Sequence, residues 1–181
     1  MTNITFVFGT RPEFIKLNKL SQLIQRNPKF SLTIVSSGQQ EFFLQKFKTS
    51  KISNINLNLG KFKNVHNFIS IFLEKFQKSI KNKNVDYLLV QGDTSTAYAT
   101  SLFGFLEKIP IIHLEAGLRT FDHYSPFPEE YFRQCISKVA NIHLAQTESA
   151  KLNLINEGIK KNKIHVIGNP GIDYLVEKIN S

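Results

Sequence analysis

Two apolar runs, at residues 87–90 and 109–112, constrain the fold of this chain more than any other feature. Both are short, rich in branched side chains and free of polar interruptions, which is typical of strands buried on both faces of a parallel sheet. Polar residues follow each run, with Asp93 after the first and Glu115 after the second. Because open α/β sheets bind ligands beyond the carboxyl ends of their strands, this part of the chain predicts both a fold and the location of a site.

Strand-like and helix-like patterns alternate along the rest of the chain. We expect strands near residues 4–8, 32–35, 55–59, 87–90, 109–114, 142–145 and 164–167. We expect helices between them. One ends near Pro28, one includes Phe42 and Phe47, four span 64–81, 94–107, 128–139 and 148–157, and the last begins at about Gly171. This alternation predicts an α/β fold with a doubly wound, Rossmann-like parallel sheet, as a single domain over residues 1–181.

Charge and hydropathy exclude several functions. The formal net charge is +9, but only four of the 23 basic residues are arginines, and the lysines are spread over predicted helix surfaces and turns. This pattern favours a solvated surface over a nucleic-acid interface. No apolar run approaches the roughly 20 residues that span a membrane, and the N-terminus lacks the basic segment of a secretion signal. We therefore expect a cytoplasmic protein that binds neither nucleic acid nor membrane.

The sequence argues against a metal site. Cys135 is the only cysteine, so no internal disulfide or cysteine-based zinc site can form, and its spacing favours the core side of a helix. His113, Glu115 and His123 are conceivable ligands, but the Pro-Cys-x-x-Cys segment of a zinc deaminase is missing. His113 and His143 occupy strand positions that more often hold packed, hydrogen-bonded histidines. We expect neither metal nor cofactor.

The turn after the first strand has two interpretations. It carries one glycine rather than Gly-x-Gly-x-x-Gly, and the sequence has no Walker motif, so a nicotinamide or P-loop site is not expected. Thr10 and Glu13 have the spacing of a capping box. Arg11 and Lys16 flank the same helix N-terminus, which suits an anion such as a pyrophosphate. Spacing alone does not choose between an anion site and ordinary capping.

Each candidate acid also has a structural interpretation. Asp93 stands where a strand turns into a helix, and its position favours an N-cap. Glu115 follows a buried strand, where an acid has no capping duty, so its position favours a functional role. Glu129 and Glu130 lie in the first turn of a helix, where the macrodipole favours acids, and Glu129 could pair with Arg133.

Five segments, taken in order, resemble the non-hydrolysing bacterial UDP-N-acetylglucosamine 2-epimerases. They are GTRPEFIK (9–16), QGDTST (91–96), HLEAGLRT (113–120), SPFPEE (125–130) and GNP (168–170). The resemblance implies a two-domain, glycosyltransferase-B-like fold, of which this chain is the N-terminal half, with the substrate between the domains. It implies conversion of UDP-N-acetylglucosamine to UDP-N-acetylmannosamine, by elimination and re-addition of UDP, without metal or nicotinamide.

The resemblance also implies roles for individual residues. Asp93, Glu115 and Glu129 fall on acidic positions implicated in catalysis, and the order of their roles stays open. Carboxylates would stabilise positive charge on the sugar as UDP leaves, and inversion needs a proton taken from one face and delivered to the other. Arg11 and Lys16 fall on substrate-binding positions, and Arg119 is a further substrate-binding candidate.

The chain departs from the family in two ways. It resembles the N-terminal domain alone, and we expect no turnover from the chain by itself. The partners to consider are a UDP-sugar, the C-terminal nucleotide-binding domain of the family and, in a homodimer, a second copy of the chain. Gln40 and Glu41 stand where the family commonly has His-Arg, which puts allosteric activation by a second UDP-N-acetylglucosamine in doubt. A glycosyltransferase half-domain and a non-catalytic binding or assembly module remain alternatives.

Overall fold

The computed structural model describes residues 1–38 and 52–179. Its strands are β1 (Thr2–Phe8), β2 (Phe30–Ser36), β3 (Ile52–Asn56), β4 (Tyr87–Gln91), β5 (Ile111–Ala116), β6 (Ile142–Ala145) and β7 (Ile164–Val166). Its α-helices are α1 (Arg11–Gln25), α2 (Val65–Ile80), α3 (Ser95–Leu106), α4 (Glu129–Val139), α5 (Glu148–Asn156) and α6 (Pro170–Ile179). The helix predicted around Phe42 and the Gln40–Glu41 departure lie outside the described residues.

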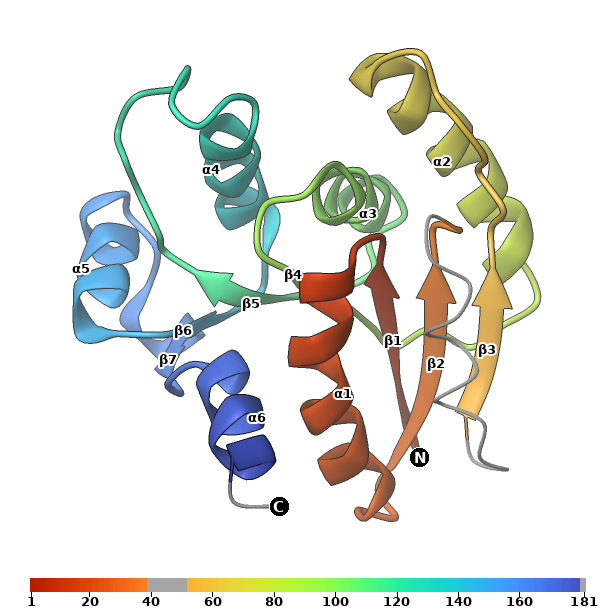
Figure 1. The fold of residues 1–181 in the computed structure, drawn as a ribbon, viewed down its shortest axis with the longest axis horizontal. Helices are drawn as coiled ribbons and strands as arrows, with labels where there is room; N and C mark the ends of the chain where they lie inside the picture. The colour runs from red at the N-terminus through yellow and green to blue at the C-terminus, as the bar shows by residue number, and fades with distance from the viewer. Residues whose placement is uncertain (39–51, 180–181) are drawn as a thin grey trace.

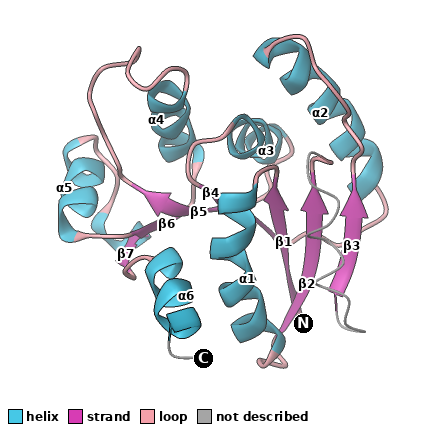
Figure 2. Cartoon of the chain, in the orientation of Figure 1, coloured by secondary structure: helices cyan, strands magenta, loops and turns pink. Residues whose placement is uncertain are grey.

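The seven strands form one parallel sheet in the order β3-β2-β1-β4-β5-β6-β7. Helices flank it, with α1 and α6 side by side on one face and α2, α3 and α4 on the other (Figures 1 and 2). The predicted doubly wound, Rossmann-like α/β fold is thus confirmed. Within the described residues, no helix is both long and apolar enough to cross a bilayer.

Burial on both faces explains the unbroken apolar runs. Phe6 and Phe8 pack with Phe14 and Leu17 of α1, whereas Val7, between them, packs with the helices of the opposite face. Successive side chains of a strand point to opposite faces, so a strand covered on both sides needs apolar residues at every position. The α2 helix covers its face with phenylalanines at i, i+4 spacing, as its predicted amphipathic pattern requires (Phe68, Phe72 and Phe76).

At two strands the predicted C-terminal end is wrong by two residues or more. The third strand was expected at 55–59, but β3 ends at Asn56, and Leu57 and Leu59 are buried because they pack against α2 beyond the end of the strand. The fifth strand was expected to end at residue 114, but β5 continues to Ala116. Glu115 therefore lies within the strand, which matters for the site.

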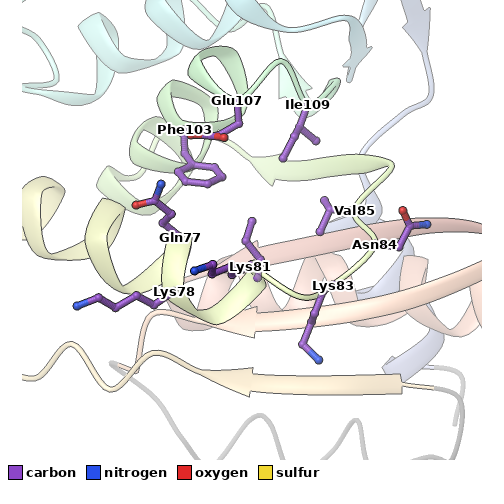
Figure 3. A pocket seen from close by; sticks show the side chains of 10 residues that line it. Gln77, Lys78, Lys81, Lys83, Asn84, Val85, Phe103, Glu107 and Ile109 are labelled. Atoms are coloured by element: carbon purple, nitrogen blue, oxygen red, sulfur yellow. The ribbon is translucent and has the colours of Figure 1, made fainter.

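The strand order reverses between β1 and β4. The chain proceeds from β1 to β2 and β3 on one side, then returns to β4 and continues to β7 on the other. At such a switch point the connections leave in opposite directions, and a crevice opens beyond the carboxyl ends of the strands. A separate hollow of about 610 Å³, rimmed by Lys78, Lys81 and Lys83, lies where β4 and β5 begin, at the opposite edge (Figure 3).

Candidate functional site

Glu115 is the extra residue of a β-bulge. Leu114 pairs with Leu144 and Ala116 with Ala145, so Glu115 has no partner of its own on β6. Its φ is +68°, a left-handed conformation that costs a non-glycine residue of order 1–3 kcal/mol. Bulges re-aim side chains and occur often beside active sites.

Three side chains from different elements hold the Glu115 carboxylate. Lys16 of α1 donates to Oε2 at 2.5 Å, and Gln91, at the end of β4, donates to the same oxygen. Gln146, just after β6, donates to Oε1 at 2.7 Å. The Glu115 side chain keeps 14% of its surface exposed. Its carboxylate is therefore fixed in place but open to a ligand.

Asp93 is not the N-cap of α3, as its position had favoured. Thr94 takes that role, and its hydroxyl accepts from the backbone N–H of Ala97 at 3.1 Å. Gly92, with a φ of +66°, turns the chain sharply at the end of β4. The turn leaves the Asp93 carboxylate without capping duty, and so available for chemistry.

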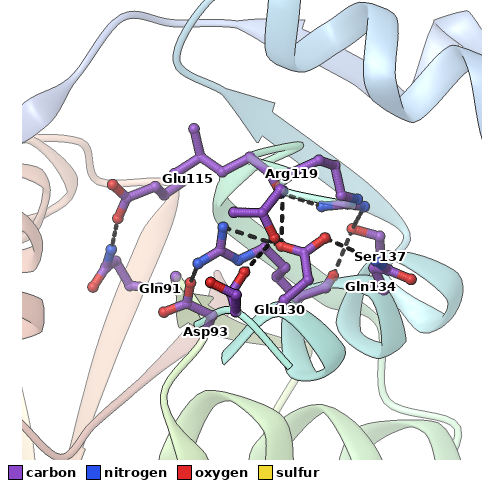
Figure 4. A network of polar contacts seen from close by, with 12 residues as sticks. Gln91, Asp93, Glu115, Arg119, Glu130, Gln134 and Ser137 are labelled. Atoms are coloured by element: carbon purple, nitrogen blue, oxygen red, sulfur yellow. Dashed lines mark hydrogen bonds and ion pairs between the residues drawn. The ribbon is translucent and has the colours of Figure 1, made fainter. Parts of the chain in front are cut away.

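Arg133 joins Asp93 to Glu130. One guanidinium nitrogen forms an ion pair with Asp93, and another lies 3.4 Å from Glu130. The predicted pairing of Arg133 with Glu129 is replaced by these two contacts among the described residues. Figure 4 shows Asp93 and Glu130 close together, with Glu115 and Gln91 beside them.

Burial raises the pKa of the Asp93 carboxyl. The Arg133 guanidinium lowers it, and the negative charges of Glu115 and Glu129 raise it again, so the net shift is upward. A carboxyl with a raised pKa beside further acids is a candidate for proton transfer. Glu129, the half-buried first residue of α4, is close enough for its charge to act on Asp93.

The two acids that begin α4 differ in environment. Glu130 is fully buried and accepts from the backbone N–H groups of Thr120 and Phe121 at 3.1 and 3.2 Å, and from Gln134 at 2.8 Å. These contacts make it a structural anchor for the loop before α4. Glu129, by contrast, is half-buried, and its charge acts on Asp93.

The first turn is capped by the protein itself. Glu13 is buried, and its Oε2 accepts from the backbone N–H groups of Gly9 and Thr10 at 3.0 and 2.7 Å, while its Oε1 accepts from the Thr94 hydroxyl at 2.7 Å. The predicted capping box is confirmed. Because a carboxylate already uses these two amides, an anion at this turn would depend on side-chain cations instead.

Arg11 and Lys16 line one hollow of about 460 Å³, with Asn169 and Ile172 at the start of α6 on its other side. Arg11 is exposed, and Lys16 connects this hollow to Glu115. Lys16 therefore lies next to Arg11 on one side and Glu115 on the other. Their predicted role in substrate binding stays a prediction.

Arg119 faces away from the acids. Its side chain is fully buried, and its Nε and Nη2 donate to Glu157 at 2.5 and 2.9 Å, with a further hydrogen bond to Ser137 at 3.0 Å. In Figure 4, Arg119 and Ser137 lie on the far side of Glu130 from Asp93. Its predicted contact with substrate is not supported by this geometry and stays a prediction.

His113 is a packed histidine within β5. Burial lowers its pKa to about 3, and its Nε2 lies 2.8 Å from the carbonyl oxygen of Gly92. The neutral imidazole can donate to that carbonyl and support the turn that carries Asp93. Cys135, which had been expected on the core side of a helix, is half-buried in α4.

Sequence patterns missed the partners of the acids. Gln91, Gln146 and Arg133 contact Glu115 or Asp93 from distant parts of the chain, with separations of 24 and 31 residues for the two glutamines. One signal was available: Gln91 and Gln146 each follow a predicted strand, as Asp93 and Glu115 do.

The carboxyl edge of the sheet therefore carries groups suited to acid–base chemistry. The charges of Glu115 and Glu129 act on Asp93, and Lys16 and Arg133 partly balance these acids. The fold and site together define a doubly wound α/β protein with a cluster of acids at its switch point. This class includes proteins that bind nucleotides and nucleotide sugars.

Comparison with known proteins identifies the family. Residues 22–181 match the model of the UDP-N-acetylglucosamine 2-epimerase family, and the chain belongs to this family. It is 38% identical, over 173 residues, to the UDP-N-acetylglucosamine 2-epimerase of Salmonella typhimurium, covering 94% of this chain and 46% of that protein. The chain thus spans about half the length of the curated relatives it matches.

Solved structures agree. The UDP-GlcNAc 2-epimerase from Neisseria meningitidis bound to UDP-GlcNAc superposes with a TM-score of 0.89 at 33% identity, over 99% of this chain and 50% of that one. A ugt transferase from Siraitia grosvenorii in complex with UDP has a TM-score of 0.64 at 11% identity, over 93% of this chain and 51% of that one. The second match shows a shared fold alone.

Proposed function

We propose that this chain is the N-terminal domain of a UDP-N-acetylglucosamine 2-epimerase, and that a C-terminal nucleotide-binding domain completes it. The observation that carries the proposal is the cluster of Asp93, Glu115 and Glu129 at the carboxyl edge of the sheet, where the other two acids act on the pKa of Asp93 and Lys16 pairs with Glu115. Family membership and the share of the relatives that the chain covers support the same conclusion.

The chemistry follows from the difficulty of the reaction. Carbon 2 of the sugar carries a hydrogen that no adjacent carbonyl acidifies, so direct removal is slow. If the bond between the anomeric carbon and UDP breaks first, positive charge develops on the sugar, and nearby carboxylates stabilise it. One carboxylate takes the proton from carbon 2, which leaves an unsaturated sugar and free UDP. UDP then adds back to the anomeric carbon while a proton reaches carbon 2 from the opposite face.

The residues suit these steps in different ways. Burial raises the pKa of Asp93 above its ordinary value, which favours this carboxyl as a proton-transfer group. Glu115 is fixed by Lys16 and two amides, which suits a carboxylate that must hold one position against the sugar. Arg11 is exposed beside the crevice and is the cation best placed to meet the departing pyrophosphate.

A chimera tests the proposal. In it, the full chain is followed by the C-terminal half of the Salmonella typhimurium relative, and UDP-N-acetylglucosamine is supplied in heavy water. We expect UDP-N-acetylmannosamine to form and deuterium to enter carbon 2, both measured by proton NMR, and we expect neither from the chain alone. Substantial turnover by the chain alone would refute the need for a second domain.

Two variants sharpen the experiment. Glu115→Gln in the chimera should lower turnover at least about 100-fold, because general acid–base groups contribute factors of this order. Glu74→Gln, which changes an exposed acid on α2 paired with Lys78, is the matched control and should leave turnover unchanged. A chimera that folds and binds UDP-N-acetylglucosamine, yet neither epimerises it nor exchanges its carbon 2 hydrogen, would overturn the proposed function. Sugar transfer to an acceptor would favour the glycosyltransferase alternative.

A further inference from the structure

Arg133 is the cation that contacts Asp93 among the described residues. The Arg133 side chain is 13% exposed and lies between the partly exposed Asp93 and the fully buried Glu130. The nearby cation Lys16 already pairs with Glu115. Arg133 is on α4, whereas Asp93 follows β4, so the ion pair joins two elements that are far apart in the sequence.

Glu130 explains why the guanidinium stays in place. Its two oxygens accept from two backbone N–H groups and from Gln134, so its position is set by the loop before α4. Arg133 therefore contacts an acid whose position is held by three hydrogen bonds. A guanidinium presents several donors in a rigid plane and can hold two carboxylates at once, which a lysine ammonium does less well.

We propose that Arg133 is a positioning residue that holds the Asp93 carboxylate in the crevice and offsets its negative charge. The expected effect of Arg133 on catalysis rests on the proposed function. The contact between Arg133 and Asp93 does not. It assigns Glu130 the role of anchor for Arg133. It also explains why two neighbouring acids, Glu129 and Glu130, have different environments at the start of α4.

The charges around Asp93 explain why a cation is needed there. Glu115 on β5 and Glu129 on α4 both act to raise the pKa of Asp93, as does burial, and Arg133 opposes them. Without Arg133, the carboxyl would hold its proton to higher pH and lose the contact that fixes its orientation. Asp93 would then differ from the wild type in both its position and its pKa.

The first measurement uses the chain as it is. The Asp93 side-chain carboxyl is followed by carbon-13 NMR through a pH titration, in the wild type and in Arg133→Gln. We expect the midpoint to rise by about one pH unit, the lower end of the effect of removing an adjacent opposite charge, because Asp93 is partly solvated. Arg133→Lys keeps the charge and should show a smaller rise, and it keeps the test decisive if Arg133→Gln does not fold.

Arg119→Gln is the matched control. Arg119 is also a buried arginine held by an acid, Glu157, but it does not contact Asp93. Its substitution should leave the Asp93 midpoint unchanged even if it lowers the thermal stability of the chain. Equal midpoints in the wild type and the folded Arg133 variants would overturn the inference.

The second measurement uses the chimera. Arg133→Gln should lower kcat roughly 100-fold, as small misplacements of a reacting group do, with little change in KM, and should move the pH limb of Asp93 upward. A merely structural role would reduce the active fraction equally at every pH. If the wild-type chimera is inactive but the Asp93 midpoint responds to Arg133→Gln, the proposed function fails and the contact stands. If the midpoint does not respond, the positioning role fails whatever the turnover.

Discussion

Replacing Glu13 tests how the first turn is held to the rest of the site. The Glu13 carboxylate is buried, and it is the acceptor for the backbone N–H groups of Gly9 and Thr10 and for the hydroxyls of Thr10 and Thr94. It thus ties the turn after β1 to the turn after β4, the two turns that flank the switch point. We expect Glu13→Ala to be strongly destabilising and Glu13→Gln to be mild.

The magnitudes follow from the hydrogen bonds. In Glu13→Ala the amides of Gly9 and Thr10 lose their acceptor, and a buried unsatisfied group costs about 1–3 kcal/mol, so the loss is about 4 kcal/mol. For a chain of this length that corresponds to a Tm lower by roughly 8–16 °C. In Glu13→Gln the amide oxygen can still accept from both N–H groups, and its NH2 can donate to the Thr94 hydroxyl, so the cost is below about 1 kcal/mol.

The pH dependence gives an independent check. Burial raises the pKa of Glu13 above its ordinary value of 4.5, against the hydrogen bonds that lower it. A raised folded-state pKa means that the native state keeps a proton which the unfolded chain has lost, so this contribution to stability is greatest at low pH and declines as the pH rises. Glu13→Gln does not titrate, and it should gain stability relative to the wild type above pH 4.5.

Thermal and urea denaturation, followed by circular dichroism between pH 4.5 and 8, measure both effects. Glu74→Gln is the control, because Glu74 is an exposed acid on α2. The reasoning fails if Glu13→Ala is no less stable than Glu13→Gln. It also fails if Glu13→Gln loses stability relative to the wild type as the pH rises.

Two further predictions concern the backbone and the buried histidine. Gly117 has a φ of +90°, and a Cβ there would lie 2.2 Å from the carbonyl oxygen of Ala150, whereas Gly158 has a φ of +87° and open space around it. Gly158→Ala should cost only the backbone strain, about 1–3 kcal/mol, whereas Gly117→Ala should lower the Tm much further because of the added clash. Equal decreases in Tm for the two variants would contradict the clash. His113 has a pKa of about 3, so its imidazole resonances should not move between pH 5 and 8, and the stability that it contributes should be lost as the pH falls below 6.5. A titration of His113 near pH 6.5 would show that its site is open to water.

Much of the fold was predictable because its signals are periodic. The strand expected at 142–145 is β6, Ile142–Ala145, and the helix expected at 94–107 is α3 with its two caps. Such segments have an apolar pattern that predicts the element and polar residues that mark its ends. Burial of the apolar residues in the core then stabilises the predicted strand or helix. β3 was misplaced because Leu57 and Leu59 have strand-like spacing but are buried by contact with α2.

The site was predictable in location but not in detail. Parallel strands bring their carboxyl ends to one edge, so Asp93 and Glu115 could be placed near each other from their positions alone. The N-cap of α3 could not be predicted from the sequence, because Asp93 and Thr94 are adjacent candidates and the turn at Gly92 decides between them. The bulge at Glu115 has no local signal, since one extra residue leaves the apolar pattern before it unchanged.

The balance of charge at the carboxyl edge bears on the proposal of a second domain. The acids Glu13, Asp93, Glu115, Glu129 and Glu130 all lie there, whereas Lys16 and Arg133 are occupied by Glu115 and by the Asp93–Glu130 pair. Arg11 is the exposed cation among the residues argued to form the site. A UDP-sugar carries two phosphate groups, and approaching an edge richer in acids than in free cations costs electrostatic energy. Under the proposed function, the acids suit the positive charge that develops on the sugar, and we expect a C-terminal domain to supply cations for UDP in addition to Arg11.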